Sequence, residues 1–415
     1  MQKISSVGWA LADQTVVSGT SFLTTIVVAR LLGVEEFGRF AVAWLIVLLF
    51  QNLHSAAIIG PLMTIGAIWP EKERSSYLGA LLQQQIVFSL VAGTFVYAGL
   101  GAVGQLASSW NLEQLALPIA LMVAAGPIAE LVRGNCYAVF RPRESFHLAV
   151  LRYSVQSALL LGLFFLAPVK ASVSAILYIT AGAAALAGLV GILCLPQVSW
   201  SISALKLVSR QHWTFSRWLL GSSFLANSRE LITNVAVGAV LGLADVGLLR
   251  AAQQIVFVMN IPLQGMGRLA TAYASRANSE GGASGLLQFT RVFVLPYMLA
   301  IGALLITIAL ASSTLVHLVF GPAYSGASSL LSAFALIMLL YLARDIFFIV
   351  SRALQKPAWE CLACFAGAVI SLPLLIPLMS KYGVAGALGA EALFLAVSLL
   401  AAAALVRAGA HLQTA

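Results

Sequence analysis

The sequence predicts an all-α polytopic membrane protein with about twelve transmembrane helices, arranged as two pseudo-symmetric six-helix lobes around a central cavity. Its composition is the first reason, because 61% of the residues are hydrophobic and 9% are charged, whereas soluble domains have roughly 45–50% and 25%. The second is the length of the stretches without Asp, Glu, Lys or Arg, which run over 40–70, 75–112, 171–205 and 292–343. Each stretch exceeds the ~20 residues that span a bilayer. The third reason is an internal repeat.

The repeat relates the N-terminal segment to a segment that begins 209 residues later, so that Trp9 and Leu32-Gly33 correspond to Trp218 and Leu241-Gly242. Between these positions, polar residues recur at spacings of 4, 7 and 11: Gln14, Ser18, Ser21 and Thr25 in the first copy, and Ser223, Asn227, Glu230 and Asn234 in the second. These spacings place each set on one helix face. A polar face on a membrane helix contacts protein or water rather than lipid. We therefore expect both faces to border a hydrophilic cavity, lined by Gln14, Ser18, Ser21, Ser223, Asn227 and Asn234.

Charges, glycines and prolines divide the apolar sequence into individual helices. We expect helices at 6–32, 37–62, 77–103, 113–139, 146–167, 172–195, 213–242, 246–273, 287–312, 325–352, 359–379 and 383–406. The first six form an N-terminal lobe over 1–195, and the last six form a C-terminal lobe over 213–415. The segment 196–212 is the expected cytoplasmic linker between the lobes. The first helix is long and contains Asp13, which favours a retained helix over a cleaved signal peptide.

Basic residues are concentrated on one side of this expected topology. Loops after even-numbered helices contain most of the Lys and Arg, including Lys72, Arg141 and Lys206, whereas loops after odd-numbered helices contain few, such as Lys381. By the positive-inside rule, both termini are expected in the cytoplasm. The net charge of +9 then reflects topology and some attraction for anionic lipid, and we expect no nucleic-acid partner.

Several ionisable residues fall inside the expected helices, where each costs at least ~2.5–3.5 kcal/mol unless it is paired or hydrated. A guanidinium group donates parallel hydrogen bonds and stays charged when desolvated, which suits an anionic diphosphate. The candidates for that role are Arg133, Arg229 and Arg344. Carboxylates inside a membrane protein are candidates for exchanging a proton or binding sodium. The candidates for ion coupling are Asp13, Glu230 and Asp345.

Two of these assignments have purely structural alternatives. Glu130 precedes Arg133 by three residues, so the two side chains can form an ion pair that serves only helix packing. Asp13 has no cation within one helical turn. It is either a hydrated carboxylate near the cytoplasmic mouth of the cavity or a group that binds a proton or sodium ion.

Other chemistries lack their motifs. Cys361 and Cys364 form a single CxxC pair in an apolar segment, without a second pair or a histidine cluster, so neither a disulfide framework nor a metal site is expected. No Gly-Lys pair occurs in the sequence, which argues against a phosphate-binding loop for ATP. A nucleophile motif is also missing. We therefore expect no catalytic residues and no cofactor other than a coupling proton or sodium ion.

Three segments are distinctive in their order: Ala29–Phe40 (ARLLGVEEFGRF), Phe320–Ala327 (FGPAYSGA) and Arg352–Pro357 (RALQKP). In this order they resemble the polysaccharide-transport branch of the multidrug/oligosaccharidyl-lipid/polysaccharide (MOP) exporter superfamily, over essentially the whole chain. The resemblance implies two six-helix lobes around a V-shaped cavity, alternating access, and proton or sodium coupling. It also implies cationic cavity residues that hold an anionic head group, here Arg133, Arg229 and Arg344.

The resemblance further implies a flippase for undecaprenyl-diphosphate-linked oligosaccharides in a bacterial inner membrane, serving O-antigen, capsule or exopolysaccharide synthesis. Its partners would be that lipid-linked glycan and membrane lipid, with a polysaccharide polymerase and a chain-length regulator as further partners, and we expect a monomer. One alternative is a cation-coupled multidrug exporter of the same fold, whose cavity should be acidic or aromatic because its substrates are organic cations. Another is a membrane glycan polymerase or ligase, which needs catalytic residues on the outer side, where the expected loops are short and contain few ionisable groups.

Overall fold

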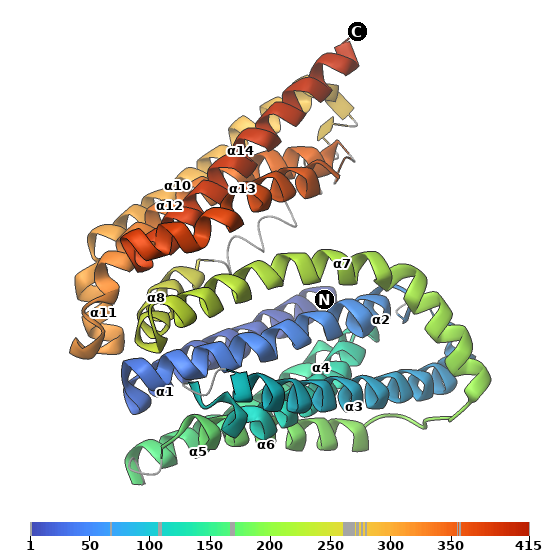
Figure 1. Ribbon diagram of the computed structural model, residues 1–415. Coiled ribbons are helices and arrows are strands. Elements are labelled where there is room, and N and C mark those ends of the chain that lie inside the picture. The colour runs from blue at the N-terminus through green and yellow to red at the C-terminus, as the bar shows by residue number, and fades with distance from the viewer. Residues whose placement is uncertain are drawn as a thin grey trace. The chain divides into compact units, whose positions relative to one another are not determined.

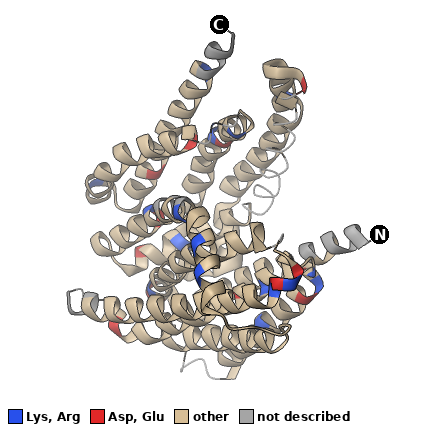
Figure 2. Ribbon diagram, turned by 90° about the vertical axis from the view of Figure 1, so that its right-hand side faces the viewer, with Lys and Arg blue, Asp and Glu red and all other residues tan. Residues whose placement is uncertain are grey.

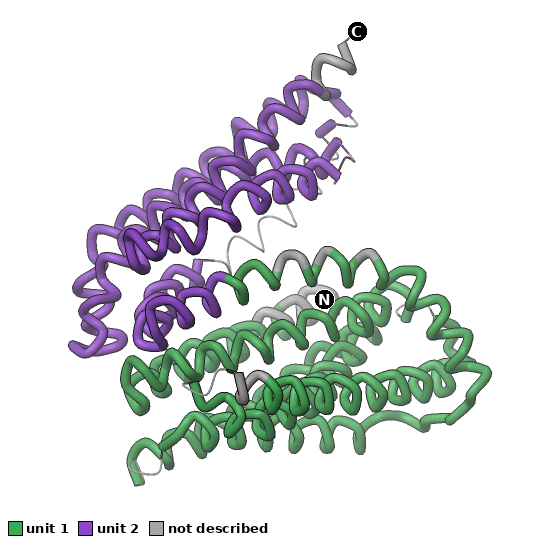
Figure 3. Tube along the Cα trace, viewed as in Figure 1, with its two compact units in different colours: residues 1–232 green, residues 233–415 purple. Residues whose placement is uncertain are grey.

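In the computed structural model, every regular segment of the described chain is helical (Figure 1). The structure describes residues 2–66, 69–106, 110–166, 171–259 and 280–414 apart from 355 and 357, together with 270, 274, 277 and 278. The chain divides into two compact units, Met1–Ile232 and Thr233–Ala415 (Figure 3). Each unit buries apolar side chains of its own, around Leu81 in the first and around Phe348 in the second.

The first unit is a bundle of long helices. Helix α1 (Gln2–His54) continues through a π-helical turn (Ser55–Ile59) into α2 (Gly60–Thr64), and α3 (Arg74–Leu106), α4 (Ala116–Ala138), α5 (Pro142–Leu166) and α6 (Val173–Leu193) follow. Helix α7 (Ile202–Val240) begins in the first unit and ends in the second. Helix α4 contacts α1, α3, α5 and α6. It is therefore the central helix of the unit, and most of its residues are buried.

Two glycines at corresponding places in the repeat interrupt the helices. Gly33 has φ 75° and ψ 178°, and Gly242 has φ 112° and ψ 166°. Both φ values lie in the region that glycine adopts freely because it has no Cβ. Gly33 bends α1 where the sequence predicted a short loop, and Gly242 separates α7 from α8 (Leu243–Phe257). The backbone conformation thus repeats with the same offset as the sequence.

The second unit contains α8, α10 (Leu295–Leu310), α11 (Ser312–Phe320), α12 (Ala327–Ala353), α13 (Ala358–Tyr382) and α14 (Val384–Thr414), with a π-helical turn (Thr290–Val294) before α10. Helix α12 packs against α8, α10 and α14, while α13 and α14 form a hairpin with extensive contact. Gly386 allows the two helices of this hairpin to approach closely, because a Cβ there would collide with the carbonyl oxygen of Leu378.

Nine of the described helical segments are long and apolar enough to cross a bilayer, and Figure 2 shows how sparse the charged residues are along them. The segment Ala12–Thr64 covers most of the helix expected over 6–32 and all of the helix expected over 37–62. The spans expected over 213–242 and 246–273 are not among the nine, and most of 260–273 lies outside the described residues. The all-helical, multi-pass membrane class is confirmed. The total of twelve spans stays a prediction, as do the lobe boundaries at 195 and 213.

Two helix boundaries differ from those expected. Helix α7 begins at Ile202 rather than 213, so much of the segment 196–212 is helical. The charges of Lys206 and Arg210 end the apolar run but not the helix, because Val208 and His212 on its other side are buried. Helix α11 occupies Ser312–Phe320, where a loop was expected, and the charge-free run 292–343 gave no sign of this break.

Candidate functional site

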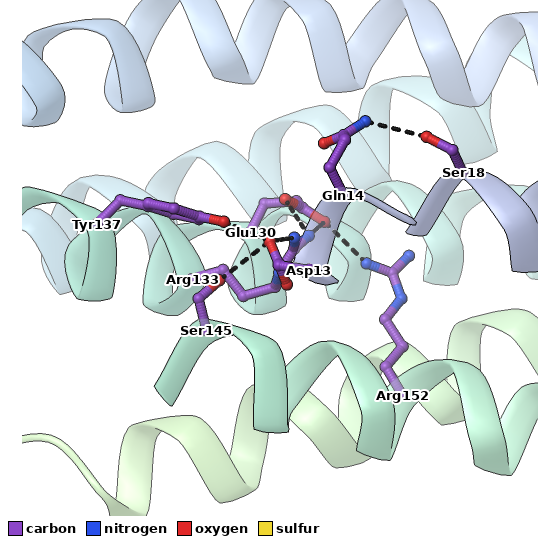
Figure 4. A network of polar contacts seen from close by, with 8 residues as sticks. All are labelled: Asp13, Gln14, Ser18, Glu130, Arg133, Tyr137, Ser145 and Arg152. Atoms are coloured by element: carbon purple, nitrogen blue, oxygen red, sulfur yellow. Dashed lines mark hydrogen bonds and ion pairs between the residues drawn. The ribbon is translucent and has the colours of Figure 1, made fainter. Parts of the chain in front are cut away.

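Asp13 lies within a buried set of polar contacts in the first unit (Figure 4). Its Oδ2 accepts hydrogen bonds from Arg133 Nη2 at 2.7 Å, from the Tyr137 hydroxyl at 2.6 Å and from Ser145 Oγ at 3.5 Å. The donors belong to α4 and α5, which both pack against α1. Asp13 Oδ1 has no hydrogen-bond partner among the described residues. Within the described residues, the carboxylate is therefore bound through one oxygen only.

Glu130 connects the arginine that binds Asp13 to a second arginine. Arg133 Nη1 donates to the two carboxylate oxygens of Glu130 at 3.0 and 3.1 Å. Arg152 Nη1 donates to Glu130 Oε1 at 3.0 Å. Arg133 and Glu130 are one turn apart on α4, whereas Arg152 lies on α5. We call Asp13, Glu130, Arg133 and Arg152 the charge cluster.

The charge cluster is electrically balanced and mostly buried. Its two carboxylates face two guanidinium groups, and the side chains of Asp13, Arg152 and Arg133 are 2%, 4% and 9% exposed. Glu130, at 36% exposed, is the member nearest the surface. Removing one partner of a buried ion pair typically costs ~3–5 kcal/mol, because it leaves a charge uncompensated in a medium of low dielectric constant. Each buried member of the charge cluster therefore depends on the others to compensate its charge.

The predicted polar face of α1 lies apart from the charge cluster. Gln14 and Ser21 are exposed and Ser18 is half-buried, and Gln14 Nε2 donates to Ser18 Oγ at 3.0 Å. Figure 4 shows this pair on a different side of α1 from Asp13, as the ~100° rotation per residue of a helix requires. Helix α1 thus presents an ionic face to α4 and α5 and an uncharged polar face to the surface of the unit.

The predicted polar residues of α7 have different surroundings. Asn227 Oδ1 accepts a hydrogen bond from Asn52 Nδ2 at 2.7 Å, which ties α7 to the end of α1, and Asn227 Nδ2 donates to the Ser223 carbonyl at 2.7 Å. Ser223 is half-buried. Asn234 is only 1% exposed and belongs to the second unit. The sequence repeat therefore extends to the backbone and the residue types but not to the burial of each side chain.

The remaining predicted charges lie on α7 and α12. Arg229 and Glu230 are half-buried on α7, and Asp345 is half-buried on α12. Arg344 is 7% exposed. Its guanidinium carbon lies 4.7 Å from the ring centroids of both Tyr341 and Phe348. Such aromatic contacts stabilise a cation by ~0.5–2 kcal/mol, with the larger values at desolvated sites.

The structure brings Asp13 and Arg133 into direct contact, although the sequence assigned them to different roles. Arg133 and Arg344 belong to different units, so their convergence on one ligand stays a prediction. Arg152 was not predicted as a site residue, although a charge within the apolar segment 146–167 was a usable signal. Tyr137, by contrast, gave no such signal. Among the described residues, no group of three His, Cys, Asp or Glu is placed to hold a metal ion.

Solved structures with the same fold are membrane transport proteins. A multidrug resistance MATE family transporter of the MOP superfamily, in an inward-facing conformation, matches with a TM-score of 0.73 at 14% identity, over 95% of this chain and 96% of that one. The lipid II flippase MurJ, in an inward closed conformation, matches with a TM-score of 0.73 at 11% identity, over 97% and 87%. A MOP superfamily transporter from Pyrococcus furiosus, described by the reverse polarity of its binding pocket, matches with a TM-score of 0.61 at 14% identity, over 96% and 92%.

These identities establish the fold alone. No curated protein sequence matches the chain. The family model for polysaccharide biosynthesis proteins matches residues 4–271, which include nearly all of α1, the helices α2 to α8 and the whole charge cluster. The chain therefore belongs to the polysaccharide biosynthesis protein family, and it has the MOP superfamily fold of the MATE transporters and MurJ.

Proposed function

We propose that this protein is a flippase that moves undecaprenyl-diphosphate-linked oligosaccharide repeat units across a bacterial inner membrane by alternating access. The observation that supports it most is the polar face of α1, where Gln14 and Ser21 are exposed on a segment with the hydropathy of a membrane span. Polar groups facing hydrocarbon without partners cost several kcal/mol each. The exposed polar face of α1 therefore avoids this cost only if it borders water. A pathway for a glycan through the membrane would provide that water.

In this proposal, the hydroxyl and amide groups of α1 and α7 replace the water around the sugar. Gln14, Ser18, Ser21, Ser223, Asn227 and Asn234 supply these groups. Arg229 and Arg344 hold the diphosphate, because a guanidinium group donates two parallel hydrogen bonds to phosphate oxygens. The polyprenyl tail remains in the lipid while the head group crosses.

We assign a coupling role to the contact between Asp13 and Arg133. Asp13 Oδ1 is the position where a proton would bind, and protonation would weaken the ion pair that Asp13 Oδ2 makes with Arg133 at 2.7 Å. Arg133, which keeps its hydrogen bonds to Glu130 at 3.0 and 3.1 Å, could then offer its Nη2 to a diphosphate in place of Asp13. An ion can drive a conformational change only if it binds the two conformations with different affinity. Glu230 and Asp345 are further candidates for such an ion-binding step.

In the proposed topology, both termini lie in the cytoplasm, where the basic loops are expected. The protein acts as a monomer beside a polysaccharide polymerase and a chain-length regulator, which use the translocated repeat units. In a cell, glycosyltransferases must supply the lipid-linked substrate on the cytoplasmic side.

The proposal is tested with the purified full chain in vesicles that contain fluorescent undecaprenyl-diphosphate-linked oligosaccharide. A membrane-impermeant quencher measures the fraction of label that reaches the outer leaflet, and we expect this fraction to rise far faster than in protein-free vesicles. Parallel vesicles report uptake of a fluorescent organic cation. Transport of the cation but not of the glycolipid would replace this proposal with a multidrug exporter. Transport of neither, by protein that elutes as a folded monomer, would also contradict it.

A further inference from the structure

The first turns of α7 are fixed to the first unit along one face. Val208, His212 and Ser216 follow each other at intervals of four residues and are 0%, 3% and 2% exposed. Ser216 Oγ donates to the Ala57 carbonyl at 3.0 Å, and Ser199 N, just before the helix, donates to the Ser75 carbonyl at 3.0 Å. This part of the chain is therefore a docked helix with a defined orientation.

His212 is the polar centre of the docked face. Its Nδ1 is 3.1 Å from Gln84 Oε1, and its Nε2 is 3.2 Å from the Tyr77 hydroxyl. Because an amide oxygen only accepts, Nδ1 carries the proton, and Tyr77 donates to Nε2. Gln84 Nε2 in turn donates to Ser209 Oγ at 3.0 Å. Burial lowers the pKa of His212, which precedes the expected span, to about 4, so this contact is uncharged at neutral pH.

The opposite face of the same turns is basic and exposed. Lys206, Arg210 and Arg217 are exposed and follow at i, i+4 and i+11, which places them on one side of the helix. Large apolar side chains flank them, with Trp213 62% and Ile202 72% exposed. A helix with basic residues beside exposed aromatic and aliphatic ones is typical of segments that lie at a membrane surface.

A surface cavity of about 560 Å³ adjoins the basic face, lined by Ile65, Leu207, Arg210, Gln211 and Thr214. Arg210 and Gln211 provide a guanidinium and an amide group, both of which donate hydrogen bonds to phosphate oxygens, whereas the Thr214 hydroxyl donates to the Arg210 carbonyl at 3.0 Å. Ile65 and Leu207 provide apolar surface beside them. The cavity thus combines donors for an anionic head group with a wall that suits the upper part of an acyl chain.

The position of these turns places the cavity at one end of the first unit. Figure 1 shows α7 crossing the end of the bundle where α3 begins, before it turns to run along the bundle. The contact between Ser199 and Ser75 at the start of α3 agrees with this view. An end of a membrane bundle lies at the level of the lipid head groups, where nearby Lys and Arg residues strengthen binding to an anionic surface.

We propose that Lys206 and Arg210, with the adjoining cavity, bind the phosphate head group of an anionic phospholipid of the leaflet that surrounds this end of the bundle. The site is distinct from the charge cluster and does not depend on which substrate is transported. Bound lipid would fix the first turns of α7, and with them the segment that joins the two units, against the membrane surface.

The test uses the full chain in vesicles that contain either phosphatidylglycerol or phosphatidylcholine with brominated acyl chains. Bromine quenches a nearby tryptophan, and the contribution of Trp213 is isolated by comparison with Trp213→Phe. We expect stronger quenching of Trp213 by brominated phosphatidylglycerol than by brominated phosphatidylcholine. The difference should shrink in Lys206→Ala/Arg210→Ala and persist in the matched control Arg141→Ala, which removes an exposed arginine that pairs with Glu144.

Two further conditions keep the test decisive if the double variant folds poorly. Raising the salt concentration with the wild-type protein should reduce the preference for phosphatidylglycerol, because salt screens exposed charges. Adding inorganic phosphate at constant ionic strength should leave the preference unchanged. Equal quenching by the two lipids, a preference that survives the double variant, or loss of the preference on addition of inorganic phosphate would each overturn the proposal. The last result would identify a site for free phosphate.

Discussion

Arg133→Ala is expected to lower the free energy of unfolding by ~3–5 kcal/mol, because it leaves buried carboxylates without their shared cation. Asp13 would lose the 2.7 Å ion pair on its only bonded oxygen, while Glu130 would keep Arg152 as its partner. Thermal unfolding of the detergent-solubilised protein, followed by its loss from the monomer peak in size-exclusion chromatography, measures the change. The variant should therefore show a markedly lower melting temperature than the wild type.

Two comparisons show whether this loss comes from charge. Arg141→Ala removes an arginine whose ion pair with Glu144 is exposed, and pairs of this kind contribute only ~0–1 kcal/mol. Asp13→Asn combined with Arg133→Gln removes both charges of the buried pair and should recover much of the stability lost in Arg133→Ala. Two results would show that the charge cluster does not hold the helices together as described. One is a loss of stability in Arg141→Ala as large as that in Arg133→Ala. The other is a loss of stability in the double variant equal to the sum of the losses in its two single variants.

Asp13→Asn is expected to reduce transport of the lipid-linked oligosaccharide by about 5–150-fold and to remove its dependence on the ion gradient, given coupling free energies of typically 1–3 kcal/mol. The asparagine side chain can still accept the hydrogen bond from Tyr137, which donates to Asp13 at 2.6 Å. It cannot, however, alternate between a charged and a neutral state. The vesicle assay with and without an imposed proton or sodium gradient measures both effects.

Glu144→Gln is the matched control for this prediction, because Glu144 is an exposed acid at the start of α5. It should transport at the wild-type rate and respond to the gradient. Gradient-dependent transport that persists in Asp13→Asn would remove Asp13 from the coupling step. It would leave the flippase proposal itself standing and shift attention to Glu230 and Asp345.

Hydropathy accounts for most of the fold, because a long uncharged segment in this composition has few alternatives to a membrane helix. The helices expected at 325–352 and 359–379 correspond closely to α12, Ala327–Ala353, and α13, Ala358–Tyr382. The predicted start of α7 at residue 213 was wrong, because hydropathy locates membrane crossings rather than helix ends. At Lys206 and Arg210 the helix continues outside the apolar run. Gly33 was correctly marked as a break, although the helix bends there instead of stopping.

The candidate site could be predicted only in part. Asp13 and Arg133 stand out individually as charges in apolar sequence, but they are 120 residues apart, and no local pattern encodes their contact. The pair of Glu130 and Arg133 is local, at i and i+3, and was foreseen as an alternative to ligand binding. The structure shows that this pair belongs to a larger cluster. The polar face of α1 was predicted from spacing alone. Gln14 and Ser21 are exposed, and their position in a substrate cavity stays a prediction.

In the proposed flippase, the polar face of α1 borders water while the rest of the surface of α1 borders lipid or protein. Ser21 and Leu23 test it directly, because both are exposed, Leu23 by 61%, yet residues two apart project about 200° from each other. Each is replaced by cysteine after the native Cys136, Cys194, Cys361 and Cys364 are changed to serine. The protein in membranes is then treated with a water-soluble maleimide. We expect rapid labelling of Ser21→Cys and little labelling of Leu23→Cys. An unreactive Ser21→Cys, or equal labelling of the two variants, would show that this face of α1 does not border water.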